Sequence, residues 1–322
     1  MKRRMWGVAF APALLALAAC GGAGEENKAM SEQSDHASQT EATRALAMQF
    51  LQRAFIEKDF RGAYNAFAAP DFIQHNPTMG DGLAAHKAHF DAMQKQWGSG
   101  TADWAHVTDM VLADGDIFAV LHHVFRSPDD AGQIVADLWR VKDGKIVEHW
   151  DVIQQMPKTM PHKNGMGCGT ANDFASAKAH EDSVVNPTCG VPDPKSSREA
   201  SLKYYHDYVG EVAKGDVIGA IEKWIHPDYK QHSPIIADGK QGAIDYLKEE
   251  WGRADAPKPV LGPQRIVADG DYVLVHYMYR LEGVPGEEAH IDIFRFTDGK
   301  MSEHWDVKQK VPETSANKNG MW

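Results

Sequence analysis

The sequence DLWRVKDGKIVEHWD at residues 137–151 returns as DIFRFTDGKMSEHWD at residues 292–306. Asp, Arg, Gly, Lys, Glu, His, Trp and Asp recur at identical spacing in the two stretches, offset by 155 residues. An Asp-Gly pair between two runs rich in apolar residues predicts a β-hairpin. Each copy therefore predicts two antiparallel strands that carry ionisable side chains where a strand usually carries apolar ones.

The length of the turn decides which side chains of the hairpin face each other. A two-residue Asp-Gly loop places Asp137 opposite Trp150, whereas a three-residue Lys-Asp-Gly loop adds a bulge and places Asp137 opposite His149. We favour the three-residue loop, because Gly followed by Lys suits the restart of a strand. Asp151 then lies on the same face as Asp137 and His149.

In that register each hairpin gathers two carboxylates and one imidazole among apolar neighbours. The second copy brings together Asp292, His304 and Asp306. The apolar neighbours on this face in the two copies are Trp139, Val141, Val147, Phe294 and Phe296. Burial in such surroundings raises the pKa of a carboxyl group, and a nearby imidazolium lowers it.

Length and composition limit the classes of protein to consider. The chain has 322 residues, 43% hydrophobic and 25% charged, which is enough for two domains with cores. A formal net charge of -11 argues against a nucleic-acid-binding protein. The 16 histidines mean that a metal site has to be considered.

The N-terminal segment has the pattern of a targeting sequence. A basic head at residues 2–4 precedes an apolar run at residues 5–19 that is too short to span a bilayer comfortably. The sequence LAACG at residues 17–21 resembles a bacterial lipoprotein signal, in which Cys20 becomes the lipidated first residue. Gly21 resembles the pattern of lipoproteins sent to the outer membrane, so we expect a lipid-anchored protein that faces the periplasm. A non-lipid secretion signal is the alternative.

The repeat extends beyond the hairpin to a whole domain. We expect a signal peptide at 1–19, a flexible tether at 20–40, a first domain at 41–166, a linker at 167–197 and a second domain at 198–322. In the first domain, apolar spacing predicts two helices within 41–69, an extended segment at 70–77, a third helix at 83–97 and strands at 105–113, 117–126, 133–141 and 146–155. Cys168 and Cys189 of the linker are able to pair in an oxidising periplasm.

Three helices followed by antiparallel strands form an α+β domain. The order of elements, QHNP at residues 74–77, the HWD strand and the closing NGM at 164–166 resemble the SnoaL-like branch of the nuclear-transport-factor-2-like superfamily. Polyketide cyclases, ketosteroid isomerase and scytalone dehydratase share that fold. The resemblance implies two tandem cone-shaped domains, each with three helices packed on a curved antiparallel sheet around a conical pocket. It implies no metal and no cofactor.

The resemblance also suggests which residues carry chemistry. In the cyclases of the family, an aspartate on a late strand moves the proton in an intramolecular aldol closure, and the nearest matches are Asp151 and Asp306. Asp137 and Asp292 point into the same cavity in the favoured register and are alternatives. His149 and His304 would orient the carboxylate or donate to an enolate oxygen. The candidate catalytic residues are therefore these two histidines and the four aspartates. The competing interpretation is a satisfied buried Asp–His pair that fixes the sheet.

Five further residues are candidates for ligand binding. Trp139 and Phe294 lie on the predicted cavity face, and His75 and His232 lie near the expected pocket mouth, where each would bind an oxyanion or bond to its own turn. His276 occupies a position that many relatives fill with His. The first copy has leucine there, which suggests two non-equivalent pockets.

Histidines of the first copy are candidates for a metal site. We expect no metal there, because no short ligand spacing stands out beyond His86 and His89.

On the outer face of the sheet we expect Arg140 and Arg295 to pair across strands with glutamates. Trp150 and its counterpart in the second copy would pack at an interface between sheets, either within one chain or in a homodimer.

The sequence thus predicts a membrane-anchored SnoaL-like lipoprotein whose partner is a small apolar ligand or substrate. Three interpretations stay open: a cyclase, isomerase or lyase that uses carboxylate-based proton transfer, a binding module for a small hydrophobic ligand, and an interaction scaffold.

Overall fold

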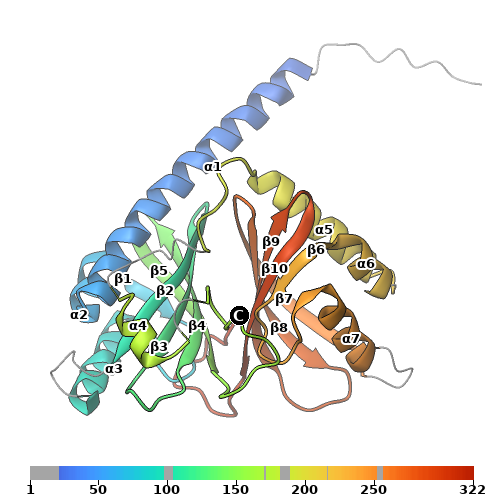
Figure 1. The fold of residues 1–322 in the computed structure, drawn as a ribbon. Coiled ribbons are helices and arrows are strands. Elements are labelled where there is room, and N and C mark those ends of the chain that lie inside the picture. The colour runs from blue at the N-terminus through green and yellow to red at the C-terminus, as the bar shows by residue number, and fades with distance from the viewer. Residues whose placement is uncertain (1–21, 98–103, 170–171, 182–188, 216, 252–256) are drawn as a thin grey trace, which may run out of the picture.

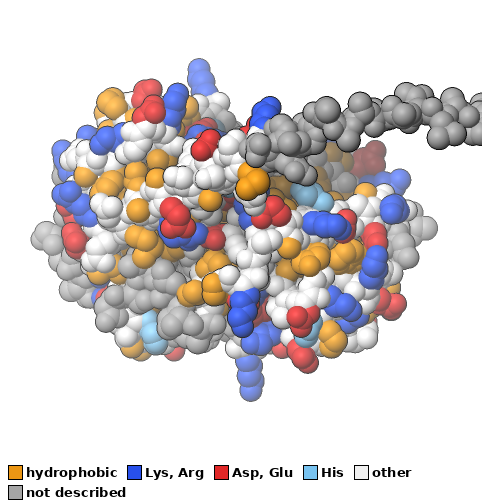
Figure 2. Space-filling model, turned by 90° about the horizontal axis from the view of Figure 1, so that it is seen from above, with side chains coloured by type: hydrophobic (Ala, Val, Ile, Leu, Met, Phe, Trp, Pro, Cys, Tyr) orange, Lys and Arg blue, Asp and Glu red, His pale blue; other side chains and the backbone are white. Residues whose placement is uncertain are grey.

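The computed structural model describes residues 22–97, 104–169, 172–181, 189–215, 217–251 and 257–322. Two five-stranded sheets pack against each other in the centre of the molecule through what we call their outer faces, and helices cover the opposite, inner face of each (Figure 1). This is the α+β architecture in two tandem copies that the sequence predicts. Figure 2 shows basic and acidic side chains interspersed over one face of the molecule, with neither sign gathered into a single patch.

The two domains repeat the same order of elements. The first contains α1 (Gly22–Leu51), η1 (Gln52–Ile56), α2 (Phe60–Phe67), β1 (Ala68–Gln74), α3 (Gly82–Trp97), β2 (Ala105–Asp114), β3 (Ile117–Phe125), β4 (Gln133–Lys142) and β5 (Lys145–Gln155). After α4 (Phe174–Lys178), the second contains α5 (Arg198–Val212), α6 (Val217–Trp224), β6 (Ile225–Gln231), α7 (Gly239–Trp251), β7 (Pro259–Asp269), β8 (Tyr272–Leu281), β9 (Glu288–Thr297) and β10 (Lys300–Lys310). The strand orders are β1-β5-β4-β3-β2 and β6-β10-β9-β8-β7.

Each sheet differs from the expected antiparallel one at its edge. β1 pairs with β5 in parallel, and β6 pairs with β10 in the same way. The other pairs are antiparallel. The extended segment predicted at 70–77 therefore joins the sheet next to the HWD strand, and this position brings Gln74 beside His149.

The first helix corrects the expected tether. Residues 22–40 belong to α1, which continues without a break into the part of the helix that packs on the domain. Four side chains attach it: His36 bonds Asp114 (2.6 Å), Thr40 Oγ1 accepts from Gly115 N (2.9 Å), Thr43 donates to Gly115 O (2.7 Å) and Arg44 pairs with Asp269 of the other domain. The segment also contains Glu, Gln, Ala and Lys, which have high helix propensity and therefore favour the helix in addition to these contacts. No helix in the described ranges is long and apolar enough to cross a membrane. The predicted signal peptide and Cys20 lie outside the described residues.

The register of the hairpin corrects the favoured turn. Lys142 pairs with Lys145, so the loop is the two-residue Asp143-Gly144, and both residues have positive φ (51° and 71°), as a type I′ turn requires. The register then shifts within the strands, and Asp137 pairs with Asp151 rather than with His149.

The face predicted for the ionisable groups is nevertheless correct. The register shift changes the pairing by one residue, so Trp139 pairs with His149, two residues from the Asp137–Asp151 pair and on the same side. Because of the shift, Ile146 packs in the core beneath the helices, where the sequence predicted Val147. The second hairpin has the same register, with Asp292 opposite Asp306.

The outer faces of the two sheets form one shared core. Trp150 and Trp305 are both fully buried there, together with residues of β2, β3, β7 and β8. Two reciprocal hydrogen bonds cross this core: Ile153 N donates to Gln309 Oε1 (2.7 Å) and Lys308 N donates to Gln154 Oε1 (2.8 Å). The two domains therefore pair through their sheets within one chain.

The predicted arginine pairs hold on the same face. Arg140 pairs with Glu148 and Arg295 with Glu303, each at 3.1 Å. These contacts border the shared core, which is consistent with a structural role for both arginines.

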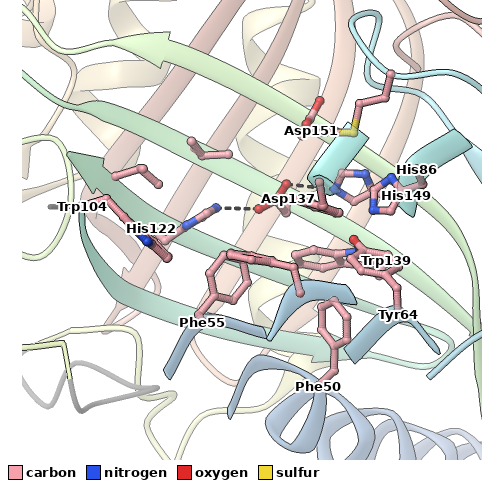
Figure 3. Close-up of a pocket in the computed structure, with 15 residues that line it drawn as sticks. Phe50, Phe55, Tyr64, His86, Trp104, His122, Asp137, Trp139, His149 and Asp151 are labelled. Atoms are coloured by element: carbon pink, nitrogen blue, oxygen red, sulfur yellow. Dashed lines mark hydrogen bonds and ion pairs between the residues drawn. The ribbon is translucent and has the colours of Figure 1, made fainter. Parts of the chain in front are cut away.

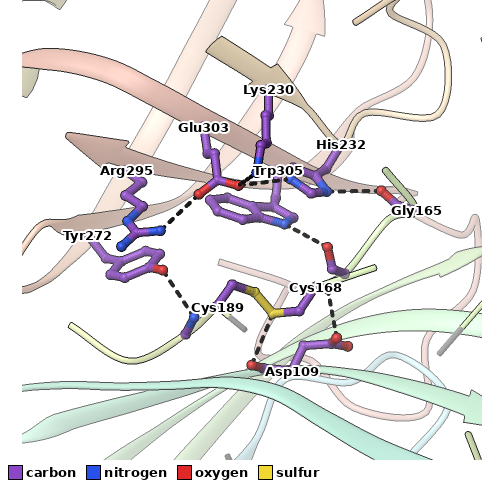
Figure 4. The surroundings of a disulfide bond; sticks show 12 residues. Asp109, Gly165, Cys168, Cys189, Lys230, His232, Tyr272, Arg295, Glu303 and Trp305 are labelled. Atoms are coloured by element: carbon purple, nitrogen blue, oxygen red, sulfur yellow. Dashed lines mark hydrogen bonds and ion pairs between the residues drawn. A yellow bond between two sulfur atoms is a disulfide. The ribbon is translucent and has the colours of Figure 1, made fainter. Parts of the chain in front are cut away.

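Residues 167–169 and 189–190 of the linker lie between the two domains and are joined by a disulfide (Figure 4). Cys168 is bonded to Cys189, with Cα atoms 5.5 Å apart. Cys168 N donates to Asp109 Oδ1 (2.8 Å) on the first domain, while Gly190 N donates to the Tyr272 hydroxyl (3.0 Å) on the second. The disulfide therefore fixes a segment that contacts both domains.

Reduction of this disulfide is expected to lower the free energy of unfolding by about 3 kcal/mol, because a cross-link restricts the unfolded chain according to the size of the loop it closes. The cysteines are separated by 21 residues. Urea unfolding with and without dithiothreitol measures the effect. A Cys168→Ser/Cys189→Ser variant is the control, and its stability should not respond to dithiothreitol. An equal response of both proteins would contradict the prediction.

Candidate active site

A cavity of about 150 Å³ lies between the helices and the inner face of the first sheet (Figure 3). Its walls are mostly aromatic and come from α1, η1, α2 and α3 on one side and from β3, β4 and β5 on the other. Trp139 lines it as predicted, and so do Asp137, His149 and Asp151. The structure thus brings four of the five predicted residues of the first domain into one apolar cavity; the fifth, His75, does not line it.

Asp137 lies between two imidazoles. His122 Nε2 is 2.5 Å from Asp137 Oδ2, and His149 Nε2 is 2.9 Å from Oδ1 (Figure 3). Burial alone would raise the pKa of Asp137, but the charges of His122 and His149 and their hydrogen bonds outweigh it and hold the pKa well below its usual range. Asp137 is therefore a fixed carboxylate whose two oxygens are occupied, which suits a positioning role better than proton transfer.

A hydrogen-bonded chain extends from His149 to α3 through Gln74. Asn76 N donates to Gln74 Oε1 (2.7 Å), and His149 Nδ1 bonds the same oxygen (3.0 Å). Gln74 Nε2 in turn lies 2.7 Å from His86 Nδ1. The chain orders His149 and His86 relative to Asp137 through direct hydrogen bonds between side chains.

Asp151 differs from Asp137 in that one of its oxygens is free. Asn76 Nδ2 donates to Asp151 Oδ2 (2.5 Å), while Oδ1 is buried and has no hydrogen-bond partner in the described part of the chain. Burial raises the pKa of Asp151 to about 6, and the nearby charge of Asp137 adds to the rise, against the opposing effect of His149. Asp151 is thus able to exchange a proton near neutral pH.

The second domain contains a larger cavity, about 500 Å³, lined by Phe294, His304, Asp292 and Asp306. His304 Nε2 lies 3.2 Å from Asp292 Oδ1, and the Tyr277 hydroxyl donates to Asp292 Oδ2 (2.5 Å). The position of His122 is therefore filled by a tyrosine. The predicted catalytic residues of the second copy and Phe294 therefore converge as well, around a different set of partners.

The second carboxylate of this cavity has a different environment from Asp151. Asp306 Oδ2 pairs with Lys308 Nζ at 2.7 Å, whereas the first domain has Ile153 at the position of Lys308. Ser233 and Ala243 stand where the first domain has Asn76 and His86. The two pockets are therefore not chemically equivalent, as we expected, but for reasons other than His276.

Three predicted ligand-binding residues lie away from the cavities. His75 stacks on Trp150 (ring centroids 5.0 Å apart) and bonds Glu148 at 2.9 Å, and His232 stacks on Trp305 (4.5 Å). Each follows the glutamine that points inward at the end of its edge strand, so its own side chain turns to the outer face.

His276 also lies on the outer face. It is fully buried at the shared core, beside Arg265, and burial together with the charge of Arg265 lowers its pKa to about 3. Along β8, Val275 and Tyr277 point to the pocket side, so the side chain of His276 points to the opposite side.

Sequence reasoning missed the roles of four residues of the first pocket. In the sequence, His122 stands out only as one of the histidines of a possible metal site, and Gln74, Asn76 and His86 carry no local signal of a catalytic site. Alternation along residues 117–125 would have placed His122 on the same side as Phe118, because the two are four residues apart on one strand.

The donor atoms of Asp137, His149 and Asp151 lie within 4.8 Å of one another, which is a spacing that a metal ion could use. Both oxygens of Asp137 and both nitrogens of His149 are, however, already bonded to side chains. A metal ion would have to replace these bonds, so the donor set fits an internal hydrogen-bonded network better than it fits a metal.

The raised pKa of Asp151 predicts a pH-dependent stability. The folded protein keeps a proton up to about pH 6 that the unfolded chain, with a usual pKa of 3.8, has already lost. The stabilisation is complete below about pH 4 and is lost as the pH rises through 6, for a total of about 3 kcal/mol. The free energy of unfolding of Asp151→Asn, measured relative to that of the wild type, should therefore rise by about 3 kcal/mol between pH 4 and pH 8. Urea unfolding at the two pH values measures this gain, and a constant difference would contradict it.

Comparison with known proteins gives one family. The SnoaL-like domain matches residues 47–149 and again residues 205–304. A search of curated proteins gave no match. Similar solved structures include TsrD from Streptomyces laurentii (18% identity, TM-score 0.28, 35% of this chain and 90% of that one). They also include an NTF2-like protein from Burkholderia xenovorans, with 15% identity and a TM-score of 0.31 over 35% of this chain and 92% of that one. A third is an LEH-like epoxide hydrolase from M. tuberculosis, with 15% identity and a TM-score of 0.29 over 36% of this chain and 86% of that one.

Proposed function

Because this chain belongs to the SnoaL-like domain family, with one such domain in each half, we propose that its first domain is a cofactor-independent enzyme that moves a proton on a small apolar carbonyl compound. Aldol cyclisation, isomerisation and dehydration are the reactions in question. Each of them can proceed by removal of a proton from the carbon next to a carbonyl group, which a positioned carboxylate is able to perform.

The environment of Asp151 carries this proposal. Asp151 lines the cavity and its Oδ1 has no hydrogen-bond partner among the described residues. With a pKa of about 6, much of Asp151 is carboxylate at neutral pH, and this carboxylate is a stronger base than one of ordinary pKa. Asn76 holds the other oxygen and thereby fixes the direction of the free one. Asp137 and His149 form the adjoining wall, and we assign them a positioning role.

The size of the cavity limits the substrate. A cavity of about 150 Å³ matches the volume of an engineered apolar cavity that binds benzene. A compound with a single ring, or an open chain of similar volume, therefore fits. The aromatic walls favour an apolar body, since they offer little hydrogen bonding away from the carboxylates.

The second domain supports the alternative function, a module that binds a small hydrophobic ligand without converting it. Asp306 Oδ1 is free, as Asp151 Oδ1 is, but Oδ2 of Asp306 is paired with the charged Lys308, whereas Oδ2 of Asp151 accepts from the neutral amide of Asn76. The cavity of the second domain is also larger, about 500 Å³. We therefore assign proton transfer to the first domain and ligand binding to the second.

Deuterium exchange tests the proposed activity directly. The protein is incubated in D₂O with a panel of single-ring ketones, and loss of the α-proton signal is followed by ¹H NMR. We expect at least one ketone to exchange faster than in buffer alone. Exchange at the buffer rate for every ketone, with a ligand still retained and identified by mass spectrometry, would favour the binding module for both domains.

We also propose that the protein is a lipoprotein anchored through Cys20 and facing the periplasm, at the outer membrane. The basic head, the apolar run and LAACG support this, and a disulfide in the linker is compatible with an oxidising compartment. Metabolic labelling with a radioactive fatty acid tests it: label should be incorporated into the wild type and absent from Cys20→Ser. Label in both proteins would contradict lipidation at Cys20.

A further inference from the structure

One buried group in the first cavity has no role in the function proposed above. His86 of α3 is 1% exposed and lines the cavity, and its Nε2 has no hydrogen-bond partner among the residues that the structure describes. A buried polar atom without a partner costs free energy that a ligand can recover. In the same cavity the other such atom is Asp151 Oδ1.

The hydrogen-bonded chain determines which nitrogen of His86 carries the proton. A backbone N–H can only donate, so Asn76 N identifies its partner atom as the oxygen of the Gln74 amide. The NH₂ group of Gln74 therefore faces His86 and donates to Nδ1. Since Nδ1 accepts, the neutral ring of His86 has its proton on Nε2, and this N–H has no acceptor among the described residues although the side chain lines the cavity.

The ring of His86 is held in the neutral form. Burial lowers its pKa well below the usual value, and the charge of His149 lowers it further. Tyr64, Phe72 and Phe90 pack around the ring, with centroids 4.0, 5.0 and 4.9 Å away. His86 is thus a rigid, uncharged hydrogen-bond donor inside an apolar cavity.

We propose that His86 is a catalytic residue that donates its Nε2–H to the oxygen of the substrate, while Asp151 Oδ1 takes the proton from the neighbouring carbon. This rests on the function proposed for the first domain and specifies its substrate as a neutral ketone with an α-hydrogen. The C–H bond breaks and its proton goes to Asp151. The electron pair forms the C=C bond of an enolate, and the negative charge moves to the oxygen at His86. A donor aimed at the atom where charge develops accelerates such a step.

The second domain provides an internal comparison. Ala243 occupies the position of His86, and Lys308 accompanies its carboxylate. Asp306 Oδ1 is free as well, but in the described part of the chain the second cavity has no imidazole at the position of His86, and its carboxylate is paired with a cation. This supports the assignment of the reaction to the first domain.

Phenol is a suitable probe, because its ring fits the cavity and its oxygen imitates that of an enolate. Binding of 4-nitrophenol is measured by absorbance for the wild type, His86→Leu and Asp151→Asn, with thermal melting to confirm folding. We expect His86→Leu to weaken binding about 10-fold or more, since a hydrogen bond to a charged oxygen is lost. Asp151→Asn should bind at least as tightly as the wild type, because it removes a negative charge from the cavity.

His89→Leu is the matched control, because His89 lies on the same helix but does not line the cavity. In ¹⁵N-histidine NMR, the Nε2–H proton of His86 should move downfield when phenol is added, which a purely structural histidine would not show. Equal affinity of the wild type and His86→Leu, or no binding to the wild type, would overturn the inference. If binding depends on His86 but no ketone exchanges deuterium, the proposed enzyme activity fails while the His86 site remains.

Discussion

Replacement of Asp151 by asparagine is expected to lower the rate of deuterium exchange on a ketone substrate by about 10²- to 10⁴-fold, the usual contribution of a general base. Asparagine keeps the volume and can still bond to Asn76, but it cannot accept a proton from carbon. Binding of a ring-sized ligand should persist, because the aromatic walls of the cavity are unchanged. ¹H NMR exchange rates at saturating ketone separate the loss of rate from any loss of affinity.

Asp306→Asn is the matched control for this prediction. It makes the same chemical change in the second cavity, where the carboxylate is paired with Lys308. We expect the exchange rate to stay at the wild-type value, with circular dichroism showing that the second domain remains folded. A loss of rate in Asp306→Asn but not in Asp151→Asn would place the reaction in the second domain instead.

The common face of Asp137, His149 and Asp151 could be predicted from sequence because strand alternation has a period of two. The exact pairing could not, because the sequence KIVEHWD does not show where the strand bulges. The structure has a two-residue turn and a shift after Arg140, whereas we expected a three-residue turn. A three-residue turn, and a two-residue turn followed by a bulge, thus place these side chains on the same face of the sheet. The two arrangements differ only in which residues pair across the strands.

The roles of His75 and His86 depend on contacts that no local pattern shows. His75 was predicted at the pocket mouth, but the parallel pairing of β1 with β5 turns it toward Trp150. His86 lies on a helix where its spacing indicates only a buried side, and its tautomer is determined by Gln74 from β1. The sequence therefore predicts the fold and the late-strand aspartates better than it predicts the residues that complete the site.

Replacement of Trp305 by alanine is expected to lower the free energy of unfolding by about 3–5 kcal/mol, the usual cost of truncating a buried aromatic side chain. Trp305 is fully buried in the core that the two sheets share, and it stacks on His232. Because residues of both domains form this core, we expect one cooperative transition for the whole chain, in the wild type and in the variant. Urea unfolding followed by circular dichroism measures both the free energy and the number of transitions.

Two phenylalanine variants separate the hydrogen bond of Trp305 from its packing. Trp305 Nε1 donates to Gly167 O (3.0 Å), so Trp305→Phe leaves a buried carbonyl without its donor and should cost about 1–3 kcal/mol beyond the loss of packing. Trp150 has the equivalent place in the first domain, but its Nε1 is buried without a partner among the described residues. Trp150→Phe removes that unsatisfied group and keeps an aromatic ring for Arg265, whose guanidinium lies 3.9 Å from the Trp150 ring centroid. It should therefore be the milder substitution. Equal costs at the two positions would mean that packing alone, rather than the linker contact, determines the stability of the shared core.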